Sequence, residues 1–313
     1  MIRKDFILSQ ARNLLSEFLQ PIADRTDRPR KKFLRQTVGA ILLSGSMVIN
    51  ELCWWIRDDC SDRFYRLKRL LNHLKSPATN MDPMVQAYRQ MMAKKIQPDT
   101  PIPIDLTDLA RPRARKMKYL KQIRDGNDGK LVPGYLCVEV YAHLSNKRII
   151  PLALDVFSVD DPLVGSQNLQ IIRTIKAVHQ AINGKGIWVA DRGFDAITLY
   201  EQWISLNCNF VVRQRGDRCV ITDSAVRIVL RDLVEHLRHR QASAGQQTRI
   251  VFARVRLPGI SRQLYVVASW RPGKEEPLIL LTTMVVENLE QAQQILRYYK
   301  QRWACLLYTS DAA

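Results

Sequence analysis

Two aspartates in this 313-residue chain follow apolar runs that have the composition of buried β-strands. Asp105 comes directly after residues 102–104, and Asp191 comes directly after residues 186–190. Each is the first acid beyond its strand, where ligand-facing groups leave the edge of an α/β sheet. If the two strands are neighbours, the carboxylates converge and repel each other, which favours a cation between them. A pair of Mg²⁺ ions held in this way activates the attacking and leaving oxygens of phosphodiester chemistry.

The same two aspartates also have a purely structural interpretation, since an Asp at a strand end often caps the following turn or helix. Three nearby acids compete with them. Asp108 lies three residues beyond Asp105, and Asp155 lies inside an apolar run. Asp195 stands just before Ala196, where a helix N-cap would be.

A basic segment follows the first carboxylate. Residues 111–124, RPRARKMKYLKQIR, carry seven Lys and Arg and no acid. Such a run is commonly a solvated face or a loop. Beside a site that cuts phosphodiesters, we favour a clamp that grips phosphates without reading bases. The candidate clamp residues are Arg111, Arg113, Arg115 and Lys116.

The charge balance of the whole chain is strongly basic, with 48 Lys and Arg against 30 Asp and Glu, a net charge of +18 at pH 7. An excess of this size indicates a polyanionic partner, usually nucleic acid, although a merely solubilising excess has the same composition. Residues 1–96 hold 18 basic and 9 acidic residues, a difference of 9, so half of the net charge lies there.

Cysteines and apolar segments together indicate the cytoplasm. None of the six cysteines forms a Cys-x-x-Cys pair, which argues against a zinc ribbon or a disulfide framework. The first residues lack the apolar core of a signal peptide. The longest apolar stretch, residues 38–49, is shorter than the ~20 residues of a membrane helix. We therefore expect a cytoplasmic protein without a membrane partner.

Hydrophobic periodicity predicts an all-helical N-terminal domain over residues 1–96 and an α/β domain after it. The α/β domain begins after a turn at 97–100. Its predicted elements are strands at 101–109, 134–144 and 148–158, a helix at 166–182, a strand at 186–194, a helix at 196–207 and a strand at 208–215. A β-rich insertion, about residues 216–285, precedes a last helix at 288–303 with Asn288 as its N-cap. This order predicts a mixed sheet with flanking helices.

Three stretches together resemble the catalytic core of the DDE transposases of bacterial insertion sequences, whose fold is RNase H-like. IDLTDL (104–109) is similar to the family's first-aspartate motif, and VADRGFDA (189–196) is similar to the second. YKQR (299–302) matches the opening of the third motif, Tyr-x-x-Arg-x-x-x-Glu followed by Lys, in the subgroup with a β insertion. The resemblance covers about residues 97–303, and the helical domain before it corresponds to the family's DNA-end-binding region.

The resemblance implies a role for individual residues. Asp105 and Asp191 become catalytic carboxylates that bind two Mg²⁺ ions, with Mn²⁺ as an alternative. Tyr299 and Arg302 become contacts to the DNA strand near the cleaved phosphate, and Lys300 joins this DNA-binding set. The competing interpretation is that Tyr299 and Arg302 are merely surface neighbours on a helix. The implied partners are double-stranded DNA, as terminal inverted repeats and as target, and a second copy of the chain in a homodimer on paired ends.

The third motif is incomplete in this sequence. Its glutamate is expected at position 306, where the chain has Leu306, and its lysine is expected at position 313, where the chain has Ala313. The comparison with the motif therefore predicts that the third carboxylate is missing. It also predicts that residues 304–313 are a non-native tail.

The leading hypothesis is a transposase that cleaves and joins DNA at insertion-sequence ends, crippled in this chain by the missing glutamate. The alternative is a non-catalytic DNA-binding remnant that occupies element ends. A third hypothesis is a basic RNA- or DNA-binding protein without a catalytic site. Wide separation of Asp105 and Asp191 would favour that third hypothesis.

Overall fold

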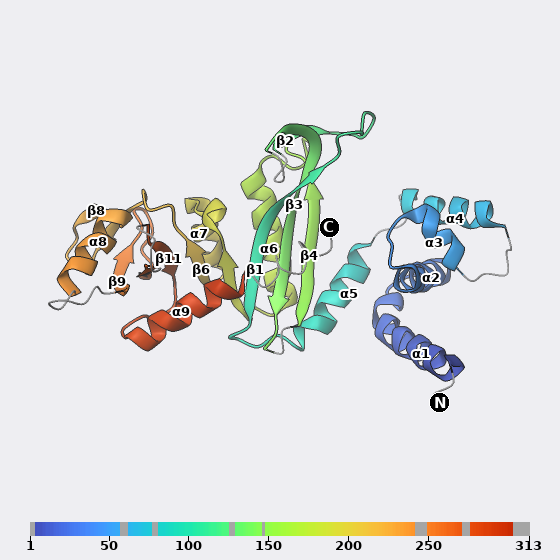
Figure 1. Ribbon diagram of the computed structural model, residues 1–313, viewed down its shortest axis with the longest axis horizontal. Helices are drawn as coiled ribbons and strands as arrows, with labels where there is room; N and C mark the ends of the chain where they lie inside the picture. Colours follow the sequence, from blue (N-terminus) through green and yellow to red (C-terminus); the bar gives the residue numbers. More distant parts are fainter. Residues whose placement is uncertain are drawn as a thin grey trace. The chain divides into compact units, whose positions relative to one another are not determined.

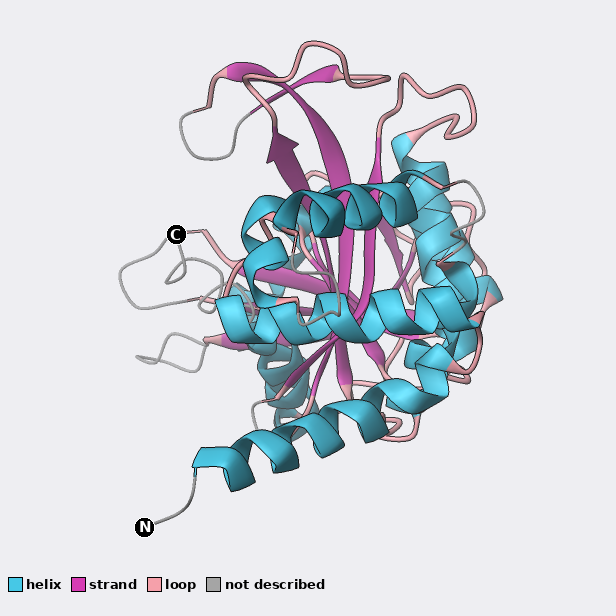
Figure 2. Ribbon diagram, turned by 90° about the vertical axis from the view of Figure 1, so that its right-hand side faces the viewer, coloured by secondary structure: helices cyan, strands magenta, loops and turns pink. Residues whose placement is uncertain are grey.

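The computed structural model describes residues 4–56, 62–76, 81–124, 129–145, 148–241, 249–270 and 276–302. The chain divides into two compact units, Met1–Lys94 and Lys95–Ala313. In the described part of the chain, the first unit is helical and the second is a mixed sheet with flanking helices (Figures 1 and 2). The predicted fold class, a helical region followed by an RNase H-like α/β domain, is therefore confirmed.

The first unit is a bundle whose helices are held together by apolar clusters. Its helices are α1 Lys4–Ala23, α2 Arg28–Ser44, α3 Ile49–Trp55, α4 Arg63–Lys75 and α5 Asp82–Ala93. Asp27 caps α2 by accepting a hydrogen bond from the Arg30 amide at 3.0 Å, and Gly45 ends it in the left-handed conformation. One cluster, which includes Phe33, Leu52 and Leu70, joins α2, α3 and α4. A second cluster joins α1 with α5.

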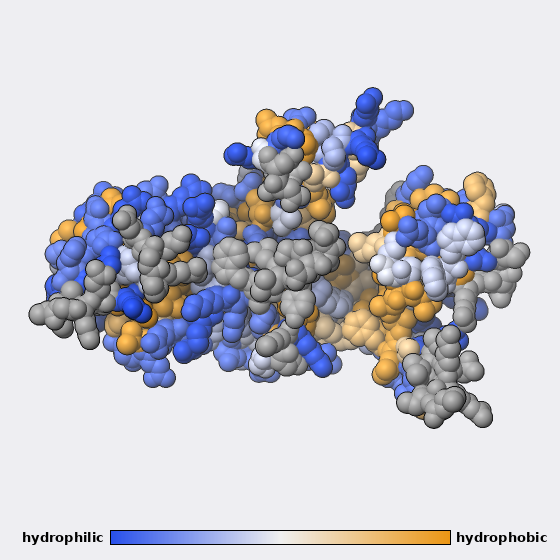
Figure 3. All heavy atoms as spheres, viewed as in Figure 1, coloured by the Kyte–Doolittle hydropathy of each residue, from blue (hydrophilic) through white to orange (hydrophobic). Residues whose placement is uncertain are grey.

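Apolar side chains also lie on the surface of this unit (Figure 3). Met47 and Trp54 are 80% and 65% exposed. No single helix in the described part of the chain is long and apolar enough to cross a membrane. The pair α2 and α3 meets the requirement of length and composition together, with a 94° bend between the two helices. Buried residues of this pair form the core of the bundle, which is the expected place for apolar helix faces in a packed protein.

The second unit is built on a sheet whose central strands are parallel. β1 (Pro101–Ala110) lies beside β5 (Ile187–Ala190), and β5 lies beside β6 (Asn209–Arg213). On the other side of β1, β3 (Leu131–His143) and β4 (Ile149–Phe157) continue the sheet in antiparallel pairing. The resulting order β4-β3-β1-β5-β6 is the RNase H-like arrangement that the motifs predict.

Two helices connect these strands in the order expected from the sequence. α6 (Gln167–Ala181) follows β4 and packs against it, and α7 (Ile197–Ser205) joins β5 to β6. The Ser166 hydroxyl accepts a hydrogen bond from the Leu169 amide at 3.2 Å and so begins α6. The rings of Trp203 on α7 and Phe210 on β6 lie 5.5 Å apart, within the usual range for packed aromatic pairs. These contacts fix the layer that carries β5.

The insertion extends the same sheet instead of forming a separate layer. β11 (Leu278–Thr282) pairs antiparallel with β6, followed by β10 (Leu264–Ser269) and β9 (Ile250–Arg256). Val266, Val267 and Leu280 are fully buried, as expected for strands covered on both faces. The predicted β-rich insertion is therefore continuous with the candidate catalytic sheet.

Four short elements of the second unit are absent from the sequence-based prediction. They are β2 (Lys121–Arg124), which pairs with β3, and β7 (Cys219–Thr222), β8 (Arg227–Val229) and α8 (Leu230–Gln241) at the outer edge of the insertion. The strands have only three or four residues, too few to show alternation. α8 is so rich in charged residues that its apolar positions do not stand out.

The last helix runs across the sheet and ends beside β1. This helix, α9 (Leu289–Gln301), begins at Asn288, whose side chain accepts a hydrogen bond from the Gln291 amide at 2.9 Å, as predicted. Its buried face includes Ala292 and Ile295 and packs on β5, β6, β10 and β11. α9 therefore brings its final residues to the strand that carries Asp105 (Figure 1).

Candidate active site

Asp105 and Asp191 lie at the same level of two neighbouring parallel strands. Asp191 is the first residue after β5, but Asp105 lies within β1, where the pairing with β5 ends, so the expectation that Asp105 follows the end of its strand is wrong. In the pairing of β1 with β5, Ile104 lies opposite Ala190, and each aspartate is the next residue in its chain. Both side chains are partly buried. Their charges interact, because the Asp191 carboxylate is among the groups that raise the pKa of Asp105. The structure thus brings the two predicted carboxylates together. A wide separation of Asp105 and Asp191, which would have favoured a nucleic-acid-binding protein without a catalytic site, is not observed.

Asp105 lies in a half-buried site beside two acids and one arginine. Burial raises the pKa of its carboxyl group above the ordinary value, Asp191 and Glu139 raise it further, and Arg302 and the Leu106 amide oppose the shift. The Arg302 Nη1 atom lies 3.2 Å from Asp105 Oδ2, and the Leu106 amide donates to Oδ1 at 3.0 Å. The pKa is still raised, so one guanidinium does not compensate for burial and two neighbouring acids. An added divalent cation would favour the ionised carboxylate.

Asp191 has the structural role considered for it from the sequence. It caps a single 3₁₀ turn, η1 (Arg192–Phe194), because its Oδ1 atom accepts a hydrogen bond from the Gly193 amide at 2.7 Å. Its second oxygen has no hydrogen bond to the described residues, so capping leaves half of the carboxylate available. Gly193 permits this close approach without strain: a Cβ atom there would lie 3.0 Å from Asp191 Oδ1, and the carboxylate would have to shift by a few tenths of an ångström.

The three competing aspartates are directed elsewhere. Asp108 is three residues beyond Asp105 on the same strand, so its side chain emerges on the opposite face of the sheet. Asp155 pairs with Val138 and accepts a hydrogen bond from the Thr174 hydroxyl of α6 at 2.5 Å. Neither side chain joins the Asp105 face. The expectation that Asp195 caps α7 is wrong, because Ala196 occupies the cap position without a side-chain bond.

Asp195 instead anchors a buried polar network that reaches into the insertion. Its carboxylate, 3% exposed, pairs with Arg218 Nε at 2.5 Å, while Arg218 Nη2 donates to the Asp195 carbonyl at 2.9 Å. The Tyr200 hydroxyl donates to Asp195 at 3.0 Å, and Gln214 Nε2 donates to that hydroxyl at 2.7 Å. Burial, followed by the Asp195 charge, raises the pKa of Tyr200 well above its ordinary value. The network ties the turn after Asp191 to the first residues of the insertion.

One acid beside the site was missed in the sequence. Glu139 lies directly opposite Asp105 in the β1–β3 pairing and therefore on the same face of the sheet. Its Oε2 atom accepts a hydrogen bond from the Tyr141 hydroxyl at 2.5 Å. The signal was available, because Glu139 is a lone charge within the otherwise apolar alternation of residues 134–144.

The residues of the third motif are buried instead of lying on a helix surface. Tyr299 is 2% exposed and Arg302 is 6% exposed, with the guanidinium carbon of Arg302 5.7 Å from the centre of the Tyr299 ring. The interpretation as surface neighbours is therefore wrong, and Arg302 serves as the ionic partner of Asp105. Lys300 is exposed. The predictions for Leu306 and for residues 304–313 lie outside the described residues.

The basic run connects β1 to β2 at some distance from the aspartates. Its four candidate residues are exposed, and the Arg111 amide is held by the Pro133 carbonyl at 2.6 Å. The run begins six residues beyond Asp105, which along a strand is about 20 Å. It is therefore outside the immediate site, but within reach of a bound duplex. The four residues are Arg111, Arg113, Arg115 and Lys116.

The donor set fits a hard divalent cation only in part. Asp105 and Asp191 provide the carboxylate oxygens that Mg²⁺ prefers, and their mutual repulsion favours a cation. In the described residues, however, no group of three or more His, Cys, Asp or Glu side chains is placed to hold a metal ion. Two carboxylates are thus available, and further ligands would have to be water or substrate oxygens.

An RNase H-like sheet that presents two adjoining carboxylates defines a class of enzymes that act on phosphodiester bonds. A family model described as "Transposase DDE domain" matches residues 96–305, about two thirds of the chain. The chain therefore belongs to the DDE transposase family, whose members recombine DNA and generally use divalent metal ions. A comparison with curated proteins gives no match.

Proposed function

We propose that this chain derives from a transposase that cleaves and joins DNA at insertion-sequence ends, with Asp105 and Asp191 as metal-binding catalytic carboxylates. The observation that carries the proposal is the adjoining position of these two residues on β1 and β5. Two Mg²⁺ ions, or Mn²⁺ in their place, would supply an activated attacking oxygen and a stabilised leaving oxygen.

The chain's own residues orient and charge the site. Arg302, at the end of α9, forms an ion pair with Asp105. A metal ion bound to Asp105 would replace this arginine as the partner of the carboxylate. The guanidinium would then be available to hold a phosphate through two hydrogen bonds. The capped turn after Asp191 fixes the direction of that carboxylate. Lys300 and the basic run at Arg111, Arg113, Arg115 and Lys116 would contact the DNA backbone without reading sequence. Tyr299, packed against Arg302, would hold that guanidinium in position.

The missing glutamate determines how far this function survives. The third motif places Leu306 at the position of a metal-binding carboxylate, so we propose that cleavage by this chain is crippled. The second candidate function is that of a remnant that occupies element ends without cutting them, and Leu306 favours it as well. Both functions require DNA binding by the helical unit, and a homodimer would pair the two ends.

Binding of Mn²⁺ tests the proposed pair of carboxylates without requiring cleavage. Asp105→Asn and Asp191→Asn are each expected to weaken Mn²⁺ binding at least tenfold, because even outer partners of metal ligands typically contribute about 10–100-fold. Electron paramagnetic resonance of free Mn²⁺ measures this. Asp108→Asn is the matched control, since it removes the same charge from the opposite face of the same strand. Equal effects of all three variants would remove the proposed site.

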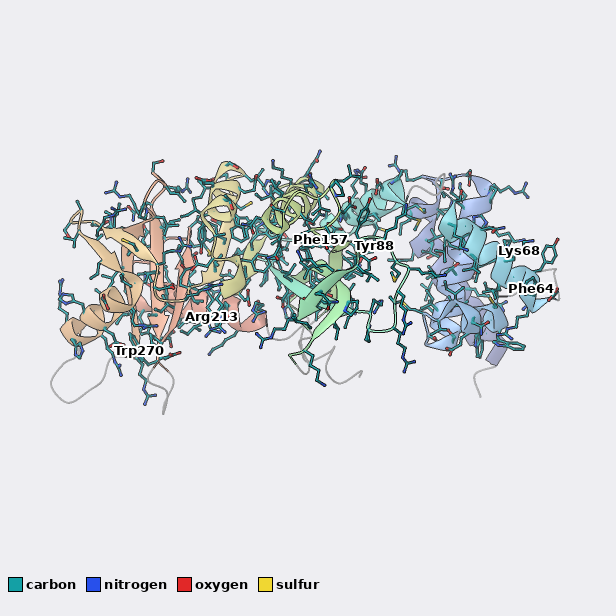
Figure 4. The ribbon with its side chains drawn as sticks, turned by 90° about the horizontal axis from the view of Figure 1, so that it is seen from above. Phe64, Lys68, Tyr88, Phe157, Arg213 and Trp270 are labelled. Carbon is teal, nitrogen blue, oxygen red and sulfur yellow. The ribbon has the colours of Figure 1, made fainter. Side chains whose placement is uncertain are left out.

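DNA binding by residues 1–96 is expected to depend steeply on salt. The region carries 18 basic residues, and every phosphate that they neutralise releases counterions. On α4, the exposed side chains of Phe64 and Lys68 lie one helical turn apart (Figure 4), a combination of aromatic and basic groups typical of nucleic-acid surfaces. Fluorescence anisotropy of a labelled duplex should show affinity falling by about 10³-fold or more between 50 and 200 mM salt if about six phosphates are contacted. An affinity independent of salt would contradict this prediction and would indicate that the basic residues of 1–96 serve solubility alone.

A further inference from the structure

A basic cavity lies between α9 and the first and last residues of the insertion strands. Its volume is about 440 Å³, which is within the usual range of ligand pockets. We call it the α9 pocket. The residues that matter for its chemistry are Arg249, Ser269, Trp270, Gln293, Arg297 and Lys300.

The pocket is built to attract an anion. Arg249, Arg297 and Lys300 are all exposed, and no carboxylate is among the described residues that line the cavity. In the described part of the chain, none of the three has a carboxylate within ion-pair distance. Gln294 holds the guanidinium of Arg297 by accepting from its Nε at 2.8 Å, so this cation is oriented instead of freely mobile. Three cations without a counter-charge favour a group that carries negative charge.

Trp270 forms one wall of the pocket. It is 5% exposed, and Figure 4 shows it among the insertion strands. One face of its ring is covered by Arg238, whose guanidinium carbon lies 4.6 Å from the ring centre. Its Nε1 atom is itself buried, so the ring shapes the cavity while the three cations supply its charge.

The pocket adjoins the candidate active site through α9. Gln293, Arg297 and Lys300 recur at four- and three-residue spacing, so one face of the helix lines the pocket. Tyr299 and Arg302, on another face, are buried against the sheet and Asp105. Lys300 is only two residues, about 3 Å along the helix axis, before Arg302. One helix therefore connects the cationic pocket with the two aspartates.

We propose that the α9 pocket binds a phosphate group of a DNA strand whose neighbouring nucleotides lie at Asp105 and Asp191. The proposal rests on the proposed function, and it deepens it by assigning Arg249 and Arg297 to strand positioning together with Lys300. The three cations bind the phosphate charge. Such contacts fix the register of a strand without reading its sequence.

The test compares DNA binding by the full chain and by two pocket variants, using a labelled duplex of about 30 base pairs with arbitrary sequence. Arg249→Gln combined with Arg297→Gln is expected to lower affinity at least tenfold near 0.15 M salt, and to reduce the slope of log affinity against log salt by about 1. Arg297→Gln alone removes one of the three cations, and is expected to lower affinity about two- to tenfold. It also covers the case in which the double variant is poorly folded.

Arg256→Gln combined with Arg262→Gln is the matched control. Both arginines are exposed, belong to the insertion and lie outside the pocket, so affinity should change less than about threefold. If the pocket and control variants weaken binding equally, the pocket inference is overturned, while Mn²⁺ binding at the aspartates can still support the proposed function. A second outcome would also overturn the pocket inference. If inorganic phosphate binds to the full chain but not to the pocket variant, while both bind DNA with equal affinity, the pocket is a site for small anions and not for a DNA strand. A chain that binds no DNA at all would instead refute the proposed function.

Discussion

Replacing Arg218 by alanine is expected to lower the free energy of unfolding by about 3–5 kcal/mol, because it leaves the carboxylate of Asp195 buried without its ionic partner. That carboxylate is 3% exposed and Arg218 is 17% exposed, so water cannot replace the lost contact easily. Domains are typically stable by only about 5–15 kcal/mol. The substitution should therefore shift urea unfolding of the full chain strongly.

Arg254→Ala provides the control for the loss of one arginine. Arg254 also pairs with an acid, Asp223, at 3.6 Å, but both side chains are more than half exposed, at 55% and 60%. An exposed pair of this kind contributes about 0–1 kcal/mol. Arg218→Lys should recover only part of the loss, since an ammonium cannot donate to the Asp195 side chain and carbonyl in the same fork. Equal destabilisation by Arg218→Ala and Arg254→Ala would contradict the anchoring role of this network.

Cleavage of DNA by the chain as it stands is expected to be less than about 1% of that of a complete relative of the same family. Loss of outer partners of metal ligands typically costs about 10–100-fold, and the proposal has Leu306 at the position of a ligand itself. A leucine side chain has no oxygen to offer to a metal ion. Nicking of supercoiled plasmid in Mg²⁺ measures the activity. Leu306→Glu alone should restore it only in part, since loosely held catalytic groups lose much of their effect.

A robust result in the opposite direction would have a specific meaning. If the unaltered chain nicks plasmid in Mg²⁺ and Asp191→Ala abolishes this activity, another residue must provide the third carboxylate. Glu139 is the residue to examine first, because it lies opposite Asp105 on the same face of the sheet. If Glu139→Gln also abolishes the activity, Glu139 provides the third carboxylate, and the prediction that Leu306 cripples the chain is wrong.

Much of the fold and of the site could be predicted because the signals are local. Apolar runs of four or more residues mark β1, β4 and β5, and the acid directly after a run predicts where a carboxylate emerges, although β1 itself continues past Asp105 to Ala110. The pairing of Asp105 with Asp191 needed only the further assumption that the two strands are neighbours, which is correct. Asn288 was predictable as a cap for the same local reason.

Contacts between distant residues could not be predicted in this way. Arg302 and Asp105 are separated by 197 positions, and nothing in either segment alone indicates that they form an ion pair. The partner of Asp195 is likewise 23 residues away, so the local pattern favoured a helix cap instead. Tyr299 is polar enough to suit a surface, yet the sheet buries it. Burial and ion pairing depend on how elements pack, which one sequence does not specify.

Gly193 has a consequence for anyone who compares or re-engineers this protein. Its backbone does not have a positive φ angle, so the usual reason for keeping glycine in a turn does not apply. The residue is confined by the Asp191 carboxylate, which a Cβ atom would meet at 3.0 Å. A glycine at this position in other sequences would then indicate that the carboxylate of the preceding aspartate lies close to the turn. Gly193→Ala would thus disturb the direction of the Asp191 carboxylate while leaving the turn itself easy to form.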